Sequence, residues 1–180
     1  FSFKKRTKVV CQIVKYADPL QVKIIQVLGH PDDAGVDISA MLTSNQVRQV
    51  FNGKIVKECK RIPAKVQMDE LENRKDLRNL LTVTIDGDDA KDFDDAISIV
   101  KNEKGYLLYV HIADVSHYVK ENSALDQEAY LRGNSIYVCD RVVPMLPFDL
   151  SNGICSLNPN VDRLTITCAM QVDEKGNLLT

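Results

Sequence analysis

The sequence predicts an α+β fold that follows two β-rich runs and a helical connector. Apolar runs rich in β-branched residues, separated by short polar turns, indicate strands, whereas capping residues followed by apolar positions on one face indicate helices. Strands mixed with helices and short hairpin turns are typical of an α+β unit. We therefore expect three segments, residues 1–35, 36–79 and 80–180.

The first segment contains two predicted strands, Lys8–Lys15 and Val22–Leu28, with a turn at Asp18-Pro19 between them. Two strands do not make a stable domain by themselves. They therefore either pair with another part of the protein or are the remnant of a larger barrel.

The connector is predicted to be partly helical. Ser44 is expected to cap a helix that starts near Asn45, and Asn52-Gly53 is expected to break it. A second helix is expected over Lys54–Arg61, and Asp69 is a candidate cap in the charged stretch that follows.

The third segment alternates short strands with one helix. Ser123 is expected to cap the helix, with Gly133 after its end. The predicted elements are strands over Leu80–Ile85, Ala96–Val100, Tyr106–Ala113, Ser135–Val138 and Leu164–Val172, a helix over Ala124–Leu131, and a turn at residues 174–177 that leads into one more strand.

Composition excludes several classes of protein. The formal net charge is -2, and no apolar run approaches the roughly 20 residues of a membrane helix. The first residues lack the apolar core of a secretory signal. The five cysteines form no C-x-x-C pair, which argues against zinc and fits a reducing compartment, so we expect a cytoplasmic protein without a membrane partner.

Charge is uneven along the chain. Residues 1–60 carry ten Lys and Arg against five Asp and Glu, whereas residues 61–180 carry thirteen against twenty. A basic front beside an acidic region suits a polyanion handled with a metal ion, although ordinary variation of a solvated surface gives the same pattern.

Six aspartates lie within the ten residues from Asp86 to Asp95, directly after an apolar run typical of a strand. Two carboxylates about 5 Å apart repel by about 3 kcal/mol at an effective dielectric constant of about 20. A divalent cation such as Mg²⁺ offsets this repulsion and takes oxygen ligands. The run therefore predicts a cation site.

The acidic run also allows other interpretations. An EF-hand loop fails because Lys91 and Ile97 stand where glycine and glutamate are required. A phosphatase that forms an aspartyl phosphate and a solvated acidic loop stay open. Elsewhere, His111 in a predicted strand is expected to be structural, and Tyr137 is either a core residue or a platform for base stacking.

Three segments of the chain resemble one known family. The segments are TVTIDGDDAKDFDDAISI, YVHIADVSHYVKENSALDQEAYLRGNSIYV and VVPMLPFDLSNGICSLNPNVDRLT. Together they are similar to the catalytic (RNB) domain of the ribonuclease II/ribonuclease R family. VKIIQVLGHPDDAGVDISAML resembles the ribonuclease R branch, where it closes the second cold-shock domain, an OB-type barrel.

The resemblance implies a processive 3′→5′ exoribonuclease that hydrolyses RNA from a single-stranded 3′ end to nucleoside 5′-monophosphates, with Mg²⁺, or Mn²⁺ as an alternative ion. The family's active-site acids, which would also hold the metal, correspond to Asp86, Asp92, Asp94 and Asp95. The family's base-stacking tyrosine corresponds to Tyr137. Asp88 and Asp89 occupy variable positions and carry no implied role.

The turn that gathers these acids is expected near Phe93. In a fully extended segment Asp92 and Asp94 would share one face and Asp95 would face away. We therefore expect the Phe93 ring to be buried as a pivot for the turn.

The resemblance also implies that the chain is a fragment. It would hold two strands of an OB-type barrel and the first part of the RNB domain, without the later catalytic arginine, so we expect the chain alone to be inactive. A non-catalytic RNA-binding module is the second hypothesis and the phosphatase the third. Exposed edges of the incomplete fold favour a homodimer.

Overall fold

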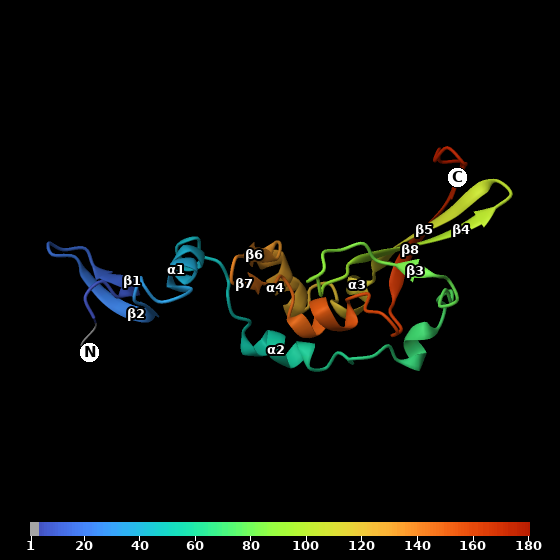
Figure 1. The fold of residues 1–180 in the computed structure, drawn as a ribbon. Coiled ribbons are helices and arrows are strands. Elements are labelled where there is room, and N and C mark those ends of the chain that lie inside the picture. Colours follow the sequence, from blue (N-terminus) through green and yellow to red (C-terminus); the bar gives the residue numbers. More distant parts are fainter. Residues whose placement is uncertain (1–3) are drawn as a thin grey trace. The chain divides into compact units, whose positions relative to one another are not determined.

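The computed structural model describes residues 4–180, which form two compact units (Figure 1). The first unit comprises the chain up to Val50 together with Ile136–Val143, and the second comprises Phe51–Ser135 together with Pro144–Thr180. Residues 1–3, which begin the first predicted segment, lie outside the described residues. Within residues 4–180, no helix has the length and apolar character needed to span a bilayer.

The first unit is built on an antiparallel hairpin of β1 (Lys8–Lys15) and β2 (Gln21–Gly29), as predicted. α1 (Val36–Ser44) packs against β2. The unit also contains a short hairpin of β6 (Ile136–Val138) and β7 (Arg141–Val143).

The expected helix after Ser44 is wrong, because α1 ends there. The Asn45 N–H bonds to the Met41 carbonyl, and the Ser44 hydroxyl donates to the same carbonyl, so both residues close a helix rather than start one. Gln46 follows with a positive φ of 57°, which stops the helical path.

The second helix of the connector is α2 (Gly53–Cys59), close to its predicted place. Asn52 was expected to break a helix, but its side-chain oxygen accepts from the N–H groups of Lys54 and Ile55 and caps this one. The short 3₁₀ helix η1 (Met68–Leu71) starts after Gln67. The predicted cap at Asp69 is therefore wrong, since that residue lies inside the turn.

The second unit contains a four-stranded antiparallel sheet in the order β3-β4-β5-β8. β4 and β5 form a long hairpin (Figure 1). The strands match their predicted positions except that β3 is shorter, and only an isolated bridge, Val172 to Leu178, follows β8. The strands are β3 (Thr82–Val83), β4 (Asp95–Asn102), β5 (Gly105–Ala113) and β8 (Thr165–Val172).

The helices of the second unit enclose its core. α4 (Ala124–Arg132) begins at Ser123, whose hydroxyl accepts from the Asp126 N–H, and ends before Gly133, as predicted. α3 (Val115–Tyr118) and the irregular helical segment η2 (Asp149–Ile154) were not predicted. The core consists of Ile55, Cys59, Tyr118, Leu125, Leu146, Leu150, Ile154, Cys155 and Leu164. The fold class is thus α+β, as expected.

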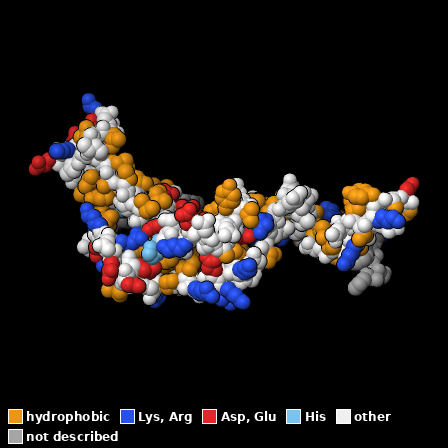
Figure 2. All heavy atoms as spheres, turned by 180° about the vertical axis from the view of Figure 1, so that it is seen from behind, with side chains coloured by type: hydrophobic (Ala, Val, Ile, Leu, Met, Phe, Trp, Pro, Cys, Tyr) orange, Lys and Arg blue, Asp and Glu red, His pale blue; other side chains and the backbone are white. Residues whose placement is uncertain are grey.

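The two faces of the sheet differ. Ala96, Ser98 and His111 are buried on one face, where His111 lies 3.0 Å from the Ser98 hydroxyl, which confirms its structural role. The other face is apolar, and its side chains remain exposed at Ile99 and Ile112. Hydrophobic side chains gather along the sheet in the space-filling view (Figure 2).

Candidate active site

The acidic run forms the connection from β3 to β4 and is anchored at its second half. The Ala113 N–H donates to the Asp94 carbonyl at 2.9 Å, and the Leu157 N–H donates to the Phe93 carbonyl at 2.9 Å. The Ser156 hydroxyl bonds to the backbone on both sides of Asp92. The second half of the run is therefore anchored to the fold, whereas the side chains of its first half, Asp86, Asp88 and Asp89, are exposed.

The four acids that the sequence singled out lie within electrostatic reach of one another around Asp94. Partial burial raises the pKa of Asp94, and the negative charges of Asp92, Asp95 and Asp86 raise it further, in that order. The backbone thus places Asp86, Asp92 and Asp95 near enough for their charges to act on the Asp94 carboxyl.

The turn near Phe93 has a different basis from the one expected. The Phe93 ring is only half-buried, so burial of the ring is not what fixes the turn. Instead, both backbone polar groups of Phe93 are hydrogen-bonded, to Ser156 and Leu157. Backbone pairing holds the chain where it bends before Asp95 enters β4.

The donor set matches a hard divalent cation in atom type and charge, because all four side chains are carboxylates with oxygen donors. The repulsion around Asp94 gives a bound cation a favourable electrostatic role. Within residues 4–180, no group of three or more His, Cys, Asp or Glu side chains has a geometry that could hold a metal ion, so the match of these acids to a cation is one of donor chemistry.

Tyr137 lies on β6 in the first unit, whereas the aspartates lie in the second. Its side chain is 66% exposed, which excludes a core position. An exposed aromatic ring on a strand is the type of surface on which a nucleic-acid base stacks.

A charged network next to the end of β5 was not predicted. Arg74 Nη2 lies 2.6 Å from Asp114 Oδ2 and 3.3 Å from His117 Nδ1, and His117 Nε2 lies 2.8 Å from Glu70 Oε1. These bonds join parts of the chain that are 40 to 47 positions apart, so the sequence spacing of the residues does not predict them. Only the Asp114 cap of α3 has a local pattern.

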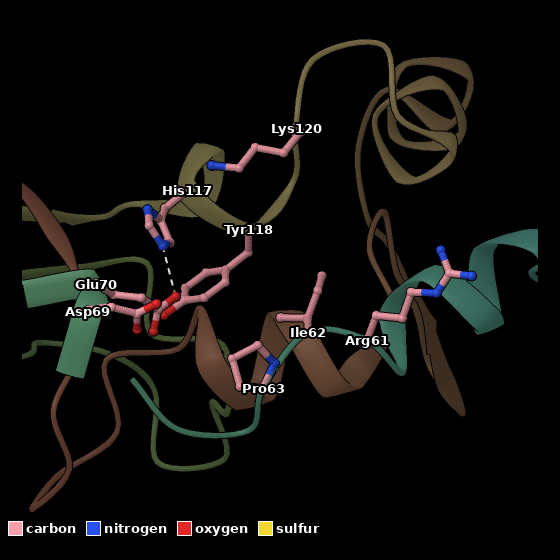
Figure 3. Close-up of a pocket in the computed structure, with 8 residues that line it drawn as sticks. All are labelled: Arg61, Ile62, Pro63, Asp69, Glu70, His117, Tyr118 and Lys120. Atoms are coloured by element: carbon pink, nitrogen blue, oxygen red, sulfur yellow. Dashed lines mark hydrogen bonds and ion pairs between the residues drawn. The ribbon is translucent and has the colours of Figure 1, made fainter. Parts of the chain in front are cut away.

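The network borders a pocket of about 420 Å³ (Figure 3). Figure 3 shows His117 directed at Glu70, with the Tyr118 ring beside them. The buried Tyr118 hydroxyl has no hydrogen-bond partner among the described residues, and burial with the nearby Glu70 charge raises its pKa to about 12. The pocket is lined by Arg61, Ile62, Pro63, Asp69, Glu70, His117, Tyr118 and Lys120.

Comparison with known proteins identifies the class. Residues 74–180 match the RNB domain, and residues 2–52 match a cold shock domain. The first match covers more than half of the chain, so the chain belongs to the RNB domain family. This membership favours an exoribonuclease over the phosphatase. The predicted boundaries at residues 35 and 79 remain predictions.

The relatives are ribonucleases R. The chain is 50% identical to ribonuclease R of Thermotoga maritima over 98% of its own length and 26% of the relative's. It is 48% identical to ribonuclease R 1 of Lactococcus lactis, over 92% of this chain and 20% of that relative. The chain therefore spans about a quarter or less of the length of these relatives.

Solved structures agree on the fold. Ribonuclease R of Mycoplasma genitalium in complex with ribose-methylated single-stranded RNA superposes with a TM-score of 0.90 at 37% identity, covering 97% of this chain and 28% of that one. Yeast Ssd1, described as a pseudonuclease, has a TM-score of 0.69 at 19% identity, and the match covers 94% of this chain and 22% of Ssd1. The second likeness shows the fold alone.

Proposed function

We propose that this chain carries the acidic half of the active centre of a Mg²⁺-dependent 3′→5′ exoribonuclease that releases nucleoside 5′-monophosphates from single-stranded RNA. One observation carries the proposal: in an RNB-family chain, the backbone brings Asp86, Asp92 and Asp95 close enough to raise the pKa of Asp94. The RNA present in the Mycoplasma genitalium structures supports RNA as the substrate class.

Each residue has a separate role in this proposal. Asp86, Asp92, Asp94 and Asp95 would hold Mg²⁺, or Mn²⁺ in its place, through their carboxylate oxygens. Bound divalent ions activate water and stabilise the charge on a leaving oxygen in phosphodiester hydrolysis. Tyr137 would stack on an RNA base and orient the strand, since its exposed ring lies on the short β6–β7 hairpin.

The competing function is a non-catalytic RNA-binding module. The fold itself does not decide between the two, because a pseudonuclease shares it. The carboxylates support the exoribonuclease, because RNA is a polyanion and acids gathered around Asp94 repel it unless a metal ion intervenes. A module that only binds RNA gains nothing from them.

Labelled single-stranded RNA tests the proposal. In a protein that contains this chain together with the segments of the longer relatives, we expect stepwise loss of 3′ nucleotides as 5′-monophosphates with Mg²⁺, and none with EDTA. Cleavage unaffected by EDTA would contradict the metal assignment, and internal cuts or 3′-phosphate products would contradict the reaction class.

The chain alone is expected to give little or no product in the same assay. It spans about a quarter of the Thermotoga maritima relative, and the loss of one preorganised group that stabilises transition-state charge typically costs about 100-fold or more in rate. A mononucleotide ladder from the 180-residue chain would contradict this expectation.

A further inference from the structure

The buried side chain of Ser156 joins the segment that follows η2 to the acidic loop. Ser156 follows η2 and is 0% exposed. Its hydroxyl donates to the Lys91 carbonyl at 2.9 Å and accepts from the Phe93 N–H at 3.0 Å. One hydroxyl therefore satisfies backbone groups immediately before and after Asp92.

Ser156 is itself held in a fixed frame. Arg163 donates from Nε to the Ser156 carbonyl at 2.7 Å and from Nη2 to the Gly153 carbonyl at 3.1 Å. The Ser156 N–H also bonds to the Gly153 carbonyl. Because Arg163 is partly buried, these bonds are shielded from water and the serine has little freedom to move.

Two further backbone hydrogen bonds hold the same part of the acidic loop. The adjacent Leu157 N–H holds the Phe93 carbonyl, and Ala113 of β5 holds the Asp94 carbonyl. Three consecutive residues of the loop, 92–94, are thereby bounded by backbone bonds on both sides. The directions of the Asp92 and Asp94 side chains depend on the backbone that these bonds fix.

We propose that Ser156 is a positioning residue for the cation site, because its hydroxyl holds the Lys91–Phe93 backbone that carries Asp92 and leads into Asp94. The inference rests on the proposed function, since it requires that these carboxylates bind Mg²⁺. A serine present only for packing would need one local hydrogen bond, whereas this hydroxyl bridges two backbone groups 63 and 65 residues away.

The test compares Mg²⁺ binding by the 180-residue chain and its variants, followed through the amide NMR signals of residues 91–95. Ser156→Ala removes both bonds, and Ser156→Cys keeps nearly the same volume with a weak donor and acceptor. Ser151→Ala is the matched control, because the Ser151 hydroxyl bonds only to its neighbour Asn152 among the described residues.

We expect Ser156→Ala to raise the Mg²⁺ concentration at half-saturation about tenfold or more, as for other groups that orient metal ligands. Ser156→Cys should fall between Ala and the wild type, and Ser151→Ala should match the wild type. Exchange of the Phe93 amide with solvent should also be faster in Ser156→Ala. If Ser156→Ala does not fold, Ser156→Cys supplies the same comparison.

The outcomes separate the two proposals. Half-saturation unchanged in folded Ser156→Ala, or in Ser156→Cys if the former is unfolded, overturns the role of Ser156 and leaves the proposed function standing. An equal loss in Ser151→Ala also overturns it, because the effect is then general destabilisation. A wild-type chain that shows no response to Mg²⁺ overturns the cation site, and the positioning role with it.

Discussion

The surroundings of Asp94 oppose the ionisation of its carboxyl group. Burial and three neighbouring acids all oppose its negative charge, and the fold retains the arrangement. Such clusters concentrate at functional sites, because a stable fold alone would not select them. Asp88 and Asp89 belong to the same acidic run but lie in the exposed turn around Gly87, where the Ala90 N–H bonds to the Gly87 carbonyl.

Tyr137 permits a prediction about RNA affinity. Tyr137→Ala should weaken binding of single-stranded RNA about 5-fold to 100-fold in fluorescence anisotropy, because stacking on one base is worth about 1–3 kcal/mol. Tyr137→Phe should bind like the wild type. Tyr130→Ala, which removes an even more exposed tyrosine from α4, is the control. Equal affinities for Tyr137→Ala and Tyr130→Ala would exclude a stacking role.

Among the elements, the end of β5 lies next to an ion pair between Arg74 and Asp114 that is expected to stabilise it. Burial alone would raise the pKa of Asp114, but hydrogen bonds from Arg74 and Ser116 and the Arg74 charge outweigh it and lower the pKa. A carboxyl whose pKa is lower in the folded state stabilises the protein above its unfolded value of about 3.9, and this stability is lost as pH falls through the folded pKa.

Asp114→Asn should therefore destabilise the chain by about 1–3 kcal/mol at pH 7 in urea unfolding, the usual worth of a hydrogen bond to a charged group. The difference from the wild type should shrink as the pH is lowered below about 4. A deficit that stayed constant from pH 7 to pH 3 would mean that packing, and not the charge, is what the substitution removes.

Some elements were predictable and others were not, for physical reasons. β4, β5, β6 and β8 have local apolar patterns, and Ser123 with Gly133 brackets α4, whereas the short strand β7 was not predicted. Ser44 was misread because serine and asparagine satisfy backbone groups at either end of a helix. The Ser156 hydrogen bonds could not be predicted from the sequence, because they join residues more than 60 positions apart and depend on tertiary packing. The acidic run stood out because crowding of like charge is visible in the sequence itself, whereas the choice of four acids within it came from the family resemblance and stays a prediction.

At the scale of the whole molecule, one face of the four-stranded sheet is apolar and exposed. It presents apolar side chains from all four strands of the sheet, and a large exposed apolar face marks an interaction site. Its exposed members are Val83, Ile99, Ile112 and Ile166.

We predict that the 180-residue chain forms a homodimer that buries this face. Sedimentation velocity over a range of concentrations should show a monomer–dimer equilibrium, and Ile99→Lys should shift it towards the monomer because a charge cannot be buried there without cost. A wild-type chain that remained monomeric at every concentration would contradict the prediction.

We expect the four acids, Asp86, Asp92, Asp94 and Asp95, to serve catalysis and not RNA binding. Asp94→Asn, in a ribonuclease that carries this chain with the remaining segments of its relatives, tests it most directly, with Asp88→Asn as a control of equal charge change in the same loop. RNA turnover and RNA affinity are measured side by side. Asp94→Asn is expected to abolish turnover with nearly unchanged RNA affinity, while Asp88→Asn is expected to retain both. Full turnover in Asp94→Asn, or an equal loss in both variants, would contradict it.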